Sequence, residues 1–166
     1  MEKGSGTRMY TFGRIIERTN ERTNERTNIL LQQRANKGQF PFKWDATVVG
    51  HPEAGDTPID AAKREWEEEL GIPWEFGDIK ETAIVQTKLK QFKPHSPYEP
   101  FSEFMYIYLV EKQLDIAKLN IQKTEVADVK YVSFQKFASL LESDQFVKYS
   151  KQYKDTIKKL LLQERV

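Results

Sequence analysis

Apolar residues gather in six short runs separated by polar, turn-forming stretches, and these runs are typical of strands. The strands that we predict cover residues 8–16, 29–34, 45–49, 79–89, 103–110 and 129–132. Helical spacing of apolar residues predicts helices at Pro58–Leu70, Phe134–Leu141 and 144–163. The alternation of the two patterns predicts an α/β fold with a mixed β-sheet between helices.

The best-marked helix is Pro58–Leu70. Its apolar residues recur at spacings of three and four, at Ile59, Ala62, Trp66 and Leu70. Thr57 is a residue type that caps a first turn, Pro58 fits the first helical position, and Gly71 followed by Pro73 is typical of a helix end. Both ends of this helix are therefore marked in the sequence.

A second stripe of the same helix is acidic. Glu65, Glu68 and Glu69 fall at positions i, i+3 and i+4, so their carboxylates share one face within a single turn. Like charges at this spacing repel and raise one another's pKa values, and a multivalent cation would relieve the repulsion. Oxygen ligands select hard ions, so we predict a Mg²⁺ or Mn²⁺ site at these glutamates, with phosphate oxygens as its partners. Arg64 can orient the glutamates through its planar guanidinium.

Segment 50–72 resembles the Nudix box, in which a glycine, an acid, an Arg-Glu pair, a Glu-Glu pair and a closing glycine follow at fixed spacings. The matching positions are Gly50, Arg64, Glu65, Glu68, Glu69, Gly71 and Ile72. Two positions depart from the pattern: Asp56 stands at the first glutamate and is one methylene shorter, and Trp66 replaces a smaller aliphatic residue. The resemblance implies the Nudix α/β/α sandwich, dependence on a divalent metal and hydrolysis of a diphosphate bond.

Around the box, the stretches ILLQQRA, FPFKWDATVVGHPEAGD and TEVADVKYVSF resemble the branch of the superfamily that includes isopentenyl-diphosphate isomerase. The isomerase has a catalytic cysteine at the position of Val49, and this chain contains no cysteine. Valine can neither donate nor abstract a proton, so isomerisation lacks a necessary group. Of the isomerase's metal-binding histidines and glutamates, His51 and Glu103 have counterparts here. The resemblance therefore favours diphosphate hydrolysis over isomerisation, and a non-catalytic binding or regulatory domain is the remaining alternative.

We therefore predict a hydrolase that cleaves a nucleoside diphosphate linked to another moiety. Glu65 or Glu103 is the candidate general base, Arg64 positions the glutamates, and the backbone at Val49 and Gly50 can add oxygen ligands to the metal. The candidate substrate-binding residues are Gly50, His51, Asp56, Arg34 and Lys43. The expected partner is a small-molecule diphosphate of the nucleotide class, and the loops carry no signature that identifies it.

Composition and charge disfavour several other classes of protein. The chain has 166 residues, 39% of them hydrophobic, which is enough for one domain over residues 1–166 with a packed core. Lys plus Arg number 26 against 25 for Asp plus Glu, so the net charge of +1 gives no reason to expect nucleic-acid or anionic-membrane binding. No apolar run is long enough for a membrane span or signal peptide, so the expected location is the cytoplasm. The sequence leaves a homodimer open.

Residues 17–28 are three tandem copies of Glu-Arg-Thr-Asn. The repeat contains no apolar residue, and its charges cancel within each copy. We therefore predict a solvated hairpin loop between the first two strands, with a partner-binding arm as the alternative.

Overall fold

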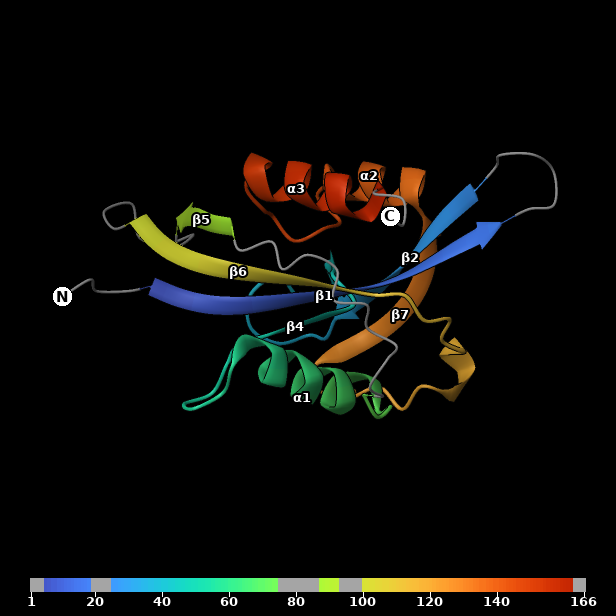
Figure 1. The fold of residues 1–166 in the computed structure, drawn as a ribbon, viewed down its shortest axis with the longest axis horizontal. Coiled ribbons are helices and arrows are strands. Elements are labelled where there is room, and N and C mark those ends of the chain that lie inside the picture. The colour runs from blue at the N-terminus through green and yellow to red at the C-terminus, as the bar shows by residue number, and fades with distance from the viewer. Residues whose placement is uncertain (1–4, 19–24, 75–86, 93–99, 163–166) are drawn as a thin grey trace.

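The structure is a computed structural model that describes residues 5–18, 25–74, 87–92 and 100–162 (Figure 1). Its strands are β1 (Ser5–Arg18), β2 (Glu25–Arg34), β3 (Trp44–Asp45), β4 (Val48–Gly50), β5 (Thr87–Phe92), β6 (Pro100–Val110) and β7 (Val126–Ser133). Its helices are α1 (Pro58–Leu70), α2 (Phe134–Leu141) and α3 (Lys151–Leu162), with a short 3₁₀ helix, η1, at Ile116–Lys118.

The described strands form one mixed, seven-stranded sheet. The order along its main path is β3-β2-β1-β6-β5, with β4 paired to β1 and β7 paired to β2. β1 and β6 run parallel, while the other pairings between these strands are antiparallel. Figure 1 shows α1 on one side of the sheet and α2 and α3 on the other. The predicted α/β fold with a mixed sheet between helices is confirmed.

Alternate residues of β1 supply the two halves of the core, because successive side chains of a strand point to opposite faces. Tyr10 and Phe12 belong to the apolar cluster that includes Ile157 of α3. Met9 lies on the other face, where it packs with Ala61 of α1. A small residue at this contact lets α1 lie close to the sheet.

The predicted helix Pro58–Leu70 is confirmed at both of its ends. Thr57 Oγ1 accepts the backbone N–H of Asp60 at 3.3 Å, which caps the first turn. Gly71 ends the helix with a left-handed φ of 67°. The predicted helix Phe134–Leu141 is confirmed as well. Among the described residues, no helix has the length and apolar character that a membrane span requires.

The third predicted helix was placed too early, because α3 begins at Lys151 and not at residue 144. Phe146 instead forms an isolated bridge with Trp44 of β3. Ser150 then caps α3, since its Oγ accepts the N–H of Tyr153 at 3.2 Å. Backbone pairing with a distant strand therefore overrides a local helical pattern.

The predicted strand 45–49 is wrong as a single element, since it is divided into β3 and β4. At the break, the N–H of Ala46 bonds to Asp45 Oδ1 at 2.8 Å, and Thr47 Oγ1 donates to the carbonyl of Leu30. The chain thereby passes from a pairing with β2 to a pairing with β1. The predicted strand 79–89 is described from Thr87 onward, as the start of β5, and its earlier residues lie outside the described part.

The hairpin predicted around the Glu-Arg-Thr-Asn repeat is confirmed, but the predicted loop 17–28 is too long. β1 and β2 remain paired as far as Glu17 opposite Arg26 and Arg18 opposite Glu25. Residues 19–24 lie outside the described part of the chain.

Candidate active site

Strand β4 and helix α1 hold the loop 51–57 between them. Met9 of β1 pairs with Gly50 of β4 and also packs with Ala61 of α1, so the helix and the end of β4 are fixed against the same strand. A Cβ built at Gly50 would lie 2.5 Å from Cδ and 2.7 Å from Oε1 of Glu65. Glycine at this position therefore lets the Glu65 carboxylate pack directly on the backbone.

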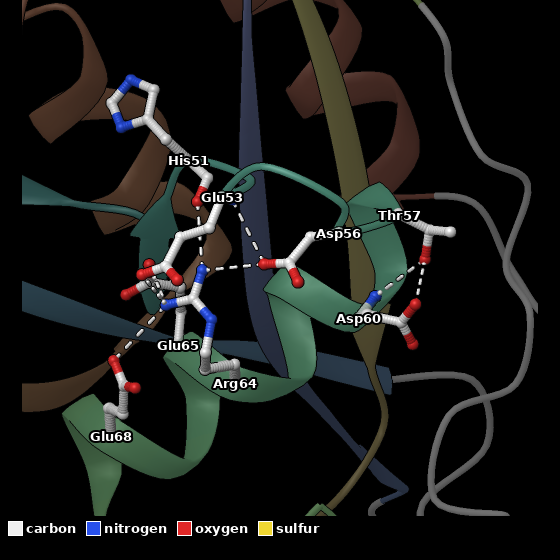
Figure 2. Close-up of polar contacts among 8 residues, drawn as sticks. All are labelled: His51, Glu53, Asp56, Thr57, Asp60, Arg64, Glu65 and Glu68. Atoms are coloured by element: carbon white, nitrogen blue, oxygen red, sulfur yellow. Dashed lines mark hydrogen bonds and ion pairs between the residues drawn. The ribbon is translucent and has the colours of Figure 1, made fainter.

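The guanidinium of Arg64 lies at the centre of the acidic residues (Figure 2). The oxygen atoms around it belong to Glu53, Asp56, Glu65, Glu68 and the backbone of His51. Nη1 lies 3.1 Å from Glu65 Oε1 and 3.6 Å from Glu68 Oε2. Nη2 lies 3.2 Å from Asp56 Oδ2, so the shorter acid still reaches the arginine. These contacts place Arg64 where it can orient Glu65 and Glu68.

Glu69 turns toward the interior and is 5% exposed. Gln32 of β2 donates an N–H from Nε2 to Glu69 Oε2 at 3.2 Å. Burial raises the pKa of Glu69 well above its ordinary value, and the charges of Glu65 and Glu125 add to the rise. A carboxyl group in this position resists ionisation unless a cation approaches it.

The acidic stripe extends from solvent into the protein. The side chain of Glu68 is 50% exposed and that of Glu65 is 18% exposed. Burial raises the pKa of Glu65 against the opposing charge of Arg64, and the charge of Glu68 adds to the rise. Within the described residues, no group of three or more His, Asp or Glu side chains converges as a ready cation site. The predicted metal ligands instead face Arg64, or Gln32 in the case of Glu69.

Glu125 is an acid near the stripe that we did not expect from the sequence. In addition to burial, its charge raises the pKa values of Glu65 and Glu69. The segment that carries it is held against the end of α1, where the N–H of Gln122 donates to the carbonyl of Glu69 at 3.0 Å. The signal in the sequence was an acid before the apolar run of β7, which is too common a pattern to indicate a site.

The backbone and the side chain of His51 face different surroundings. The carbonyl accepts an N–H of Arg64 at 3.3 Å, whereas Figure 2 shows the imidazole pointing away from the glutamates. Its Nε2 accepts a hydrogen bond from Nε of Arg8 at 3.0 Å, a residue that the sequence did not single out. Burial, together with the charge of Arg8, lowers the pKa of His51, which keeps the imidazole neutral at neutral pH.

Glu103 lies in β6 opposite Gly6 of β1, and its side chain is outside the described part.

Arg34 and Lys43, both predicted to bind substrate, contact other protein groups. Lys43 Nζ donates to the carbonyl of Asp144, in the connection between α2 and α3. Arg34 Nη1 lies 3.5 Å from Oδ2 of the buried Asp45, whose Oδ1 accepts the hydroxyl of Tyr149 at 2.6 Å. The Arg34 side chain remains 32% exposed.

Comparisons with known proteins identify the family and the fold of the chain. The chain matches the NUDIX domain family model over residues 13–153. It is 32% identical over 122 residues to an uncharacterized Nudix hydrolase of Listeria monocytogenes, with 73% of this chain and 64% of that protein covered. It is also 32% identical over 128 residues to the isopentenyl-diphosphate Delta-isomerase of Dictyostelium discoideum, with 70% and 53% covered. The chain thus spans less than two thirds of either relative. The Ap4A hydrolase of C. elegans shares the fold, with a TM-score of 0.55, 15% identity, and 95% of this chain and 93% of that chain covered.

Proposed function

The chain belongs to the Nudix hydrolase family, and we propose that it cleaves the diphosphate of a nucleoside diphosphate linked to another moiety. The observation that carries the proposal is the contact of Arg64 with both Glu65 and Glu68 beside the end of β4. A solvated acidic helix face would not combine such contacts with a buried acid and raised carboxyl pKa values. Carboxyl groups whose pKa values are raised by burial, next to a charged partner, are typical of functional sites.

The acidic side chains suit Mg²⁺ or Mn²⁺ in kind, because hard cations take carboxylate oxygens as ligands. Glu65, Glu68 and Glu69 would hold the ion, with the carbonyl oxygens of Val49 and Gly50 as further donors. When bound, the ion supplies positive charge against the diphosphate oxygens and lowers the pKa of the attacking water.

The chain's own residues would orient the site and move the proton. Arg64 would keep Glu65 and Glu68 in position, and Glu65 or Glu103 would take the proton from the attacking water. The raised pKa of Glu65, caused first by burial, supports its role as base, because a base works best when its pKa lies closer to the working pH.

Isomerisation of isopentenyl diphosphate is the second candidate, since an isomerase is among the relatives. Val49 speaks against it, because an aliphatic side chain offers no acid or base. The hydrogen bond from Arg8 to His51 also speaks against it. The guanidinium of Arg8 occupies Nε2 of the histidine, and its charge repels a cation.

The test is turnover of a substrate panel with Mg²⁺ and with Mn²⁺. The panel contains nucleoside triphosphates, dinucleoside polyphosphates such as Ap4A, nucleotide sugars and isoprenoid diphosphates. We expect oxygen from labelled water to enter a phosphate-bearing product, and deuterated water to leave no label on isoprenoid carbon. Carbon deuteration would establish the isomerase, and an absence of turnover with every substrate would favour a binding domain.

Two variants on α1 test the assignment of the glutamates. Glu68→Gln should lower kcat/KM by orders of magnitude, because it removes a ligand charge. Glu67→Gln is the matched control, because it removes the same charge from the preceding residue. The Oε1 atom of Glu67 accepts the backbone N–H of Trp74 at 2.9 Å. Equal activity of the two variants at saturating metal would refute the assignment.

A further inference from the structure

Gln32 is a buried amide that the predicted site residues do not include. It lies in β2 and is 3% exposed, with Asp45 of β3 as its partner on one side and Val129 of β7 on the other. Backbone pairing on both sides fixes its position within the sheet. Leu30, two residues earlier, packs in the apolar cluster that includes Trp66 of α1. Side chains two residues apart on a strand share a face, so Gln32 faces α1.

The amide of Gln32 meets the acidic stripe at its buried end. Its Nε2 donates to Oε2 of Glu69 at 3.2 Å, and Glu69 itself is 5% exposed. The other two acids of the stripe, Glu65 and Glu68, lie 3.1 and 3.6 Å from the guanidinium of Arg64. Among the contacts of the described residues, Glu69 is therefore the member of the stripe whose polar partner is a neutral group.

A neutral donor acts on a buried carboxylate differently from a cation. An ionised carboxylate accepts hydrogen bonds at both of its oxygens, so the N–H of Gln32 matches Oε2 of Glu69. The amide fixes the orientation of the carboxylate but brings no opposite charge to it. A buried carboxylate needs such a charge, and a divalent cation at the other oxygen, Oε1, would supply it.

We propose that Gln32 is a positioning residue for the divalent cation, because it holds Oε2 of Glu69 and so presents Oε1 as a ligand. The inference rests on the proposed function and deepens it, since it adds a residue that orients one of the three proposed metal ligands. Gln32 suits this role because a strand paired on both sides holds a ligand more precisely than a loop does. Loss of such an outer partner typically lowers metal affinity about 10–100-fold.

The test is the dissociation constant of Mn²⁺, measured on the metal-free protein without substrate from the electron paramagnetic resonance signal of the free ion. Gln32→Met should raise this constant about tenfold or more, because methionine is similar in length but has no N–H donor. Gln33→Met is the matched control and should bind Mn²⁺ as the wild type does. It makes the same substitution on the opposite face of the strand, where Nε2 of Gln33 donates to the carbonyl of Phe42 at 3.1 Å.

A double-mutant cycle distinguishes positioning of Glu69 from a structural role of the glutamine. If Gln32 acts through Glu69, Gln32→Met should change the Mn²⁺ dissociation constant less than about twofold once Glu69→Gln is present. In the Glu68→Gln background, where Glu69 remains, Gln32→Met should still raise the constant about tenfold. A glutamine that only stabilises the core would have the same effect in both backgrounds.

Three results would overturn the inference: equal Mn²⁺ affinity of Gln32→Met and the wild type, equal weakening in the two backgrounds, or no binding of Mn²⁺ by the wild type. If Gln32→Met does not fold, Gln32→Asn decides the matter, because it keeps an amide but withdraws it by one methylene. It should also weaken Mn²⁺ binding, and wild-type affinity in that variant would count against the positioning role.

Failure of the proposed function gives a different result. The substrate panel would then show no turnover, while Mn²⁺ binding would still depend on Gln32. Turnover by a protein whose Mn²⁺ affinity does not depend on Gln32 would refute the inference alone.

Discussion

Replacing Gly50 by alanine should separate catalysis from folding. The added Cβ would lie 2.5 Å from Cδ and 2.7 Å from Oε1 of Glu65, whereas non-bonded carbon atoms settle about 3.5–4.0 Å apart. The Glu65 carboxylate must therefore move by about 1 Å or more. A misplacement of about 1 Å at a reacting group can lower a rate about 10²-fold. We expect a loss in kcat of this size.

The stability of Gly50→Ala should change little. Gly50 does not have a left-handed φ, and the atoms that the methyl group meets belong to a side chain that can rotate. The melting temperature should therefore stay within a few degrees of the wild-type value, as for a cost of less than about 1 kcal/mol. Initial rates at saturating metal, measured beside a thermal melt of the same preparation, give both quantities.

Gly38→Ala is the matched control. Gly38 has a left-handed φ of 61°, and a Cβ there would meet no atom within 4 Å. This variant should lose about 1 kcal/mol of stability through backbone strain and keep its activity. Near wild-type kcat in Gly50→Ala, with an unchanged melting temperature, would show that the position of Glu65 against Gly50 does not matter for catalysis.

Three further predictions concern stability. Gly71→Ala should lower the free energy of unfolding in urea by about 2 kcal/mol or more. Like Gly38→Ala it strains a left-handed backbone, and in addition its Cβ would lie 2.7 Å from Cβ of Asn120 and closer still to the carbonyl oxygen of that residue. Equal losses in the two variants would contradict this prediction. Glu69→Gln should raise the melting temperature of the metal-free protein more at about pH 8 than at about pH 5. The raised pKa of the Glu69 carboxyl contributes stability that is present below its ordinary value of 4.5 and is lost as pH rises through the folded value, and glutamine does not titrate. A pH-independent effect would refute the reasoning. Deleting the middle repeat copy, residues 21–24, should change the unfolding free energy by less than about 1 kcal/mol and leave turnover unchanged, and a large loss of turnover would indicate a functional arm.

Helix α1 could be predicted to the residue because the signals that set its ends are local. Thr57 caps the N–H of a residue three positions along, and Gly71 takes its left-handed conformation within the last turn. The acidic stripe follows from the helical period once these ends are known. The sequence alone was therefore enough to predict the helix and the acidic residues on it. It was also enough to predict that Arg64 and Glu68, which are one helical turn apart, lie in contact.

The features that could not be predicted depend on residues far apart in the sequence. The bridge from Phe146 to Trp44 delays the start of α3, and nothing near residue 144 indicates it. The contact between Arg8 and His51 depends on the pairing of β1 with β4, which a single sequence does not reveal. The influence of Glu125 on the glutamates likewise depends on how the segment before β7 meets the end of α1.

The acidic stripe connects the metal proposal with the pH prediction. Burial first, and then the charges of neighbouring acids, raise the pKa values of Glu65 and Glu69, so a proton and a divalent cation would relieve the same strain. The cation needs the deprotonated carboxylates, so its binding should release protons and should strengthen as pH rises. Glutamine at position 69 would remove the repulsion and also one of the proposed ligands. Stability and activity should therefore move in opposite directions in Glu69→Gln, as expected where a buried acid serves chemistry and not folding.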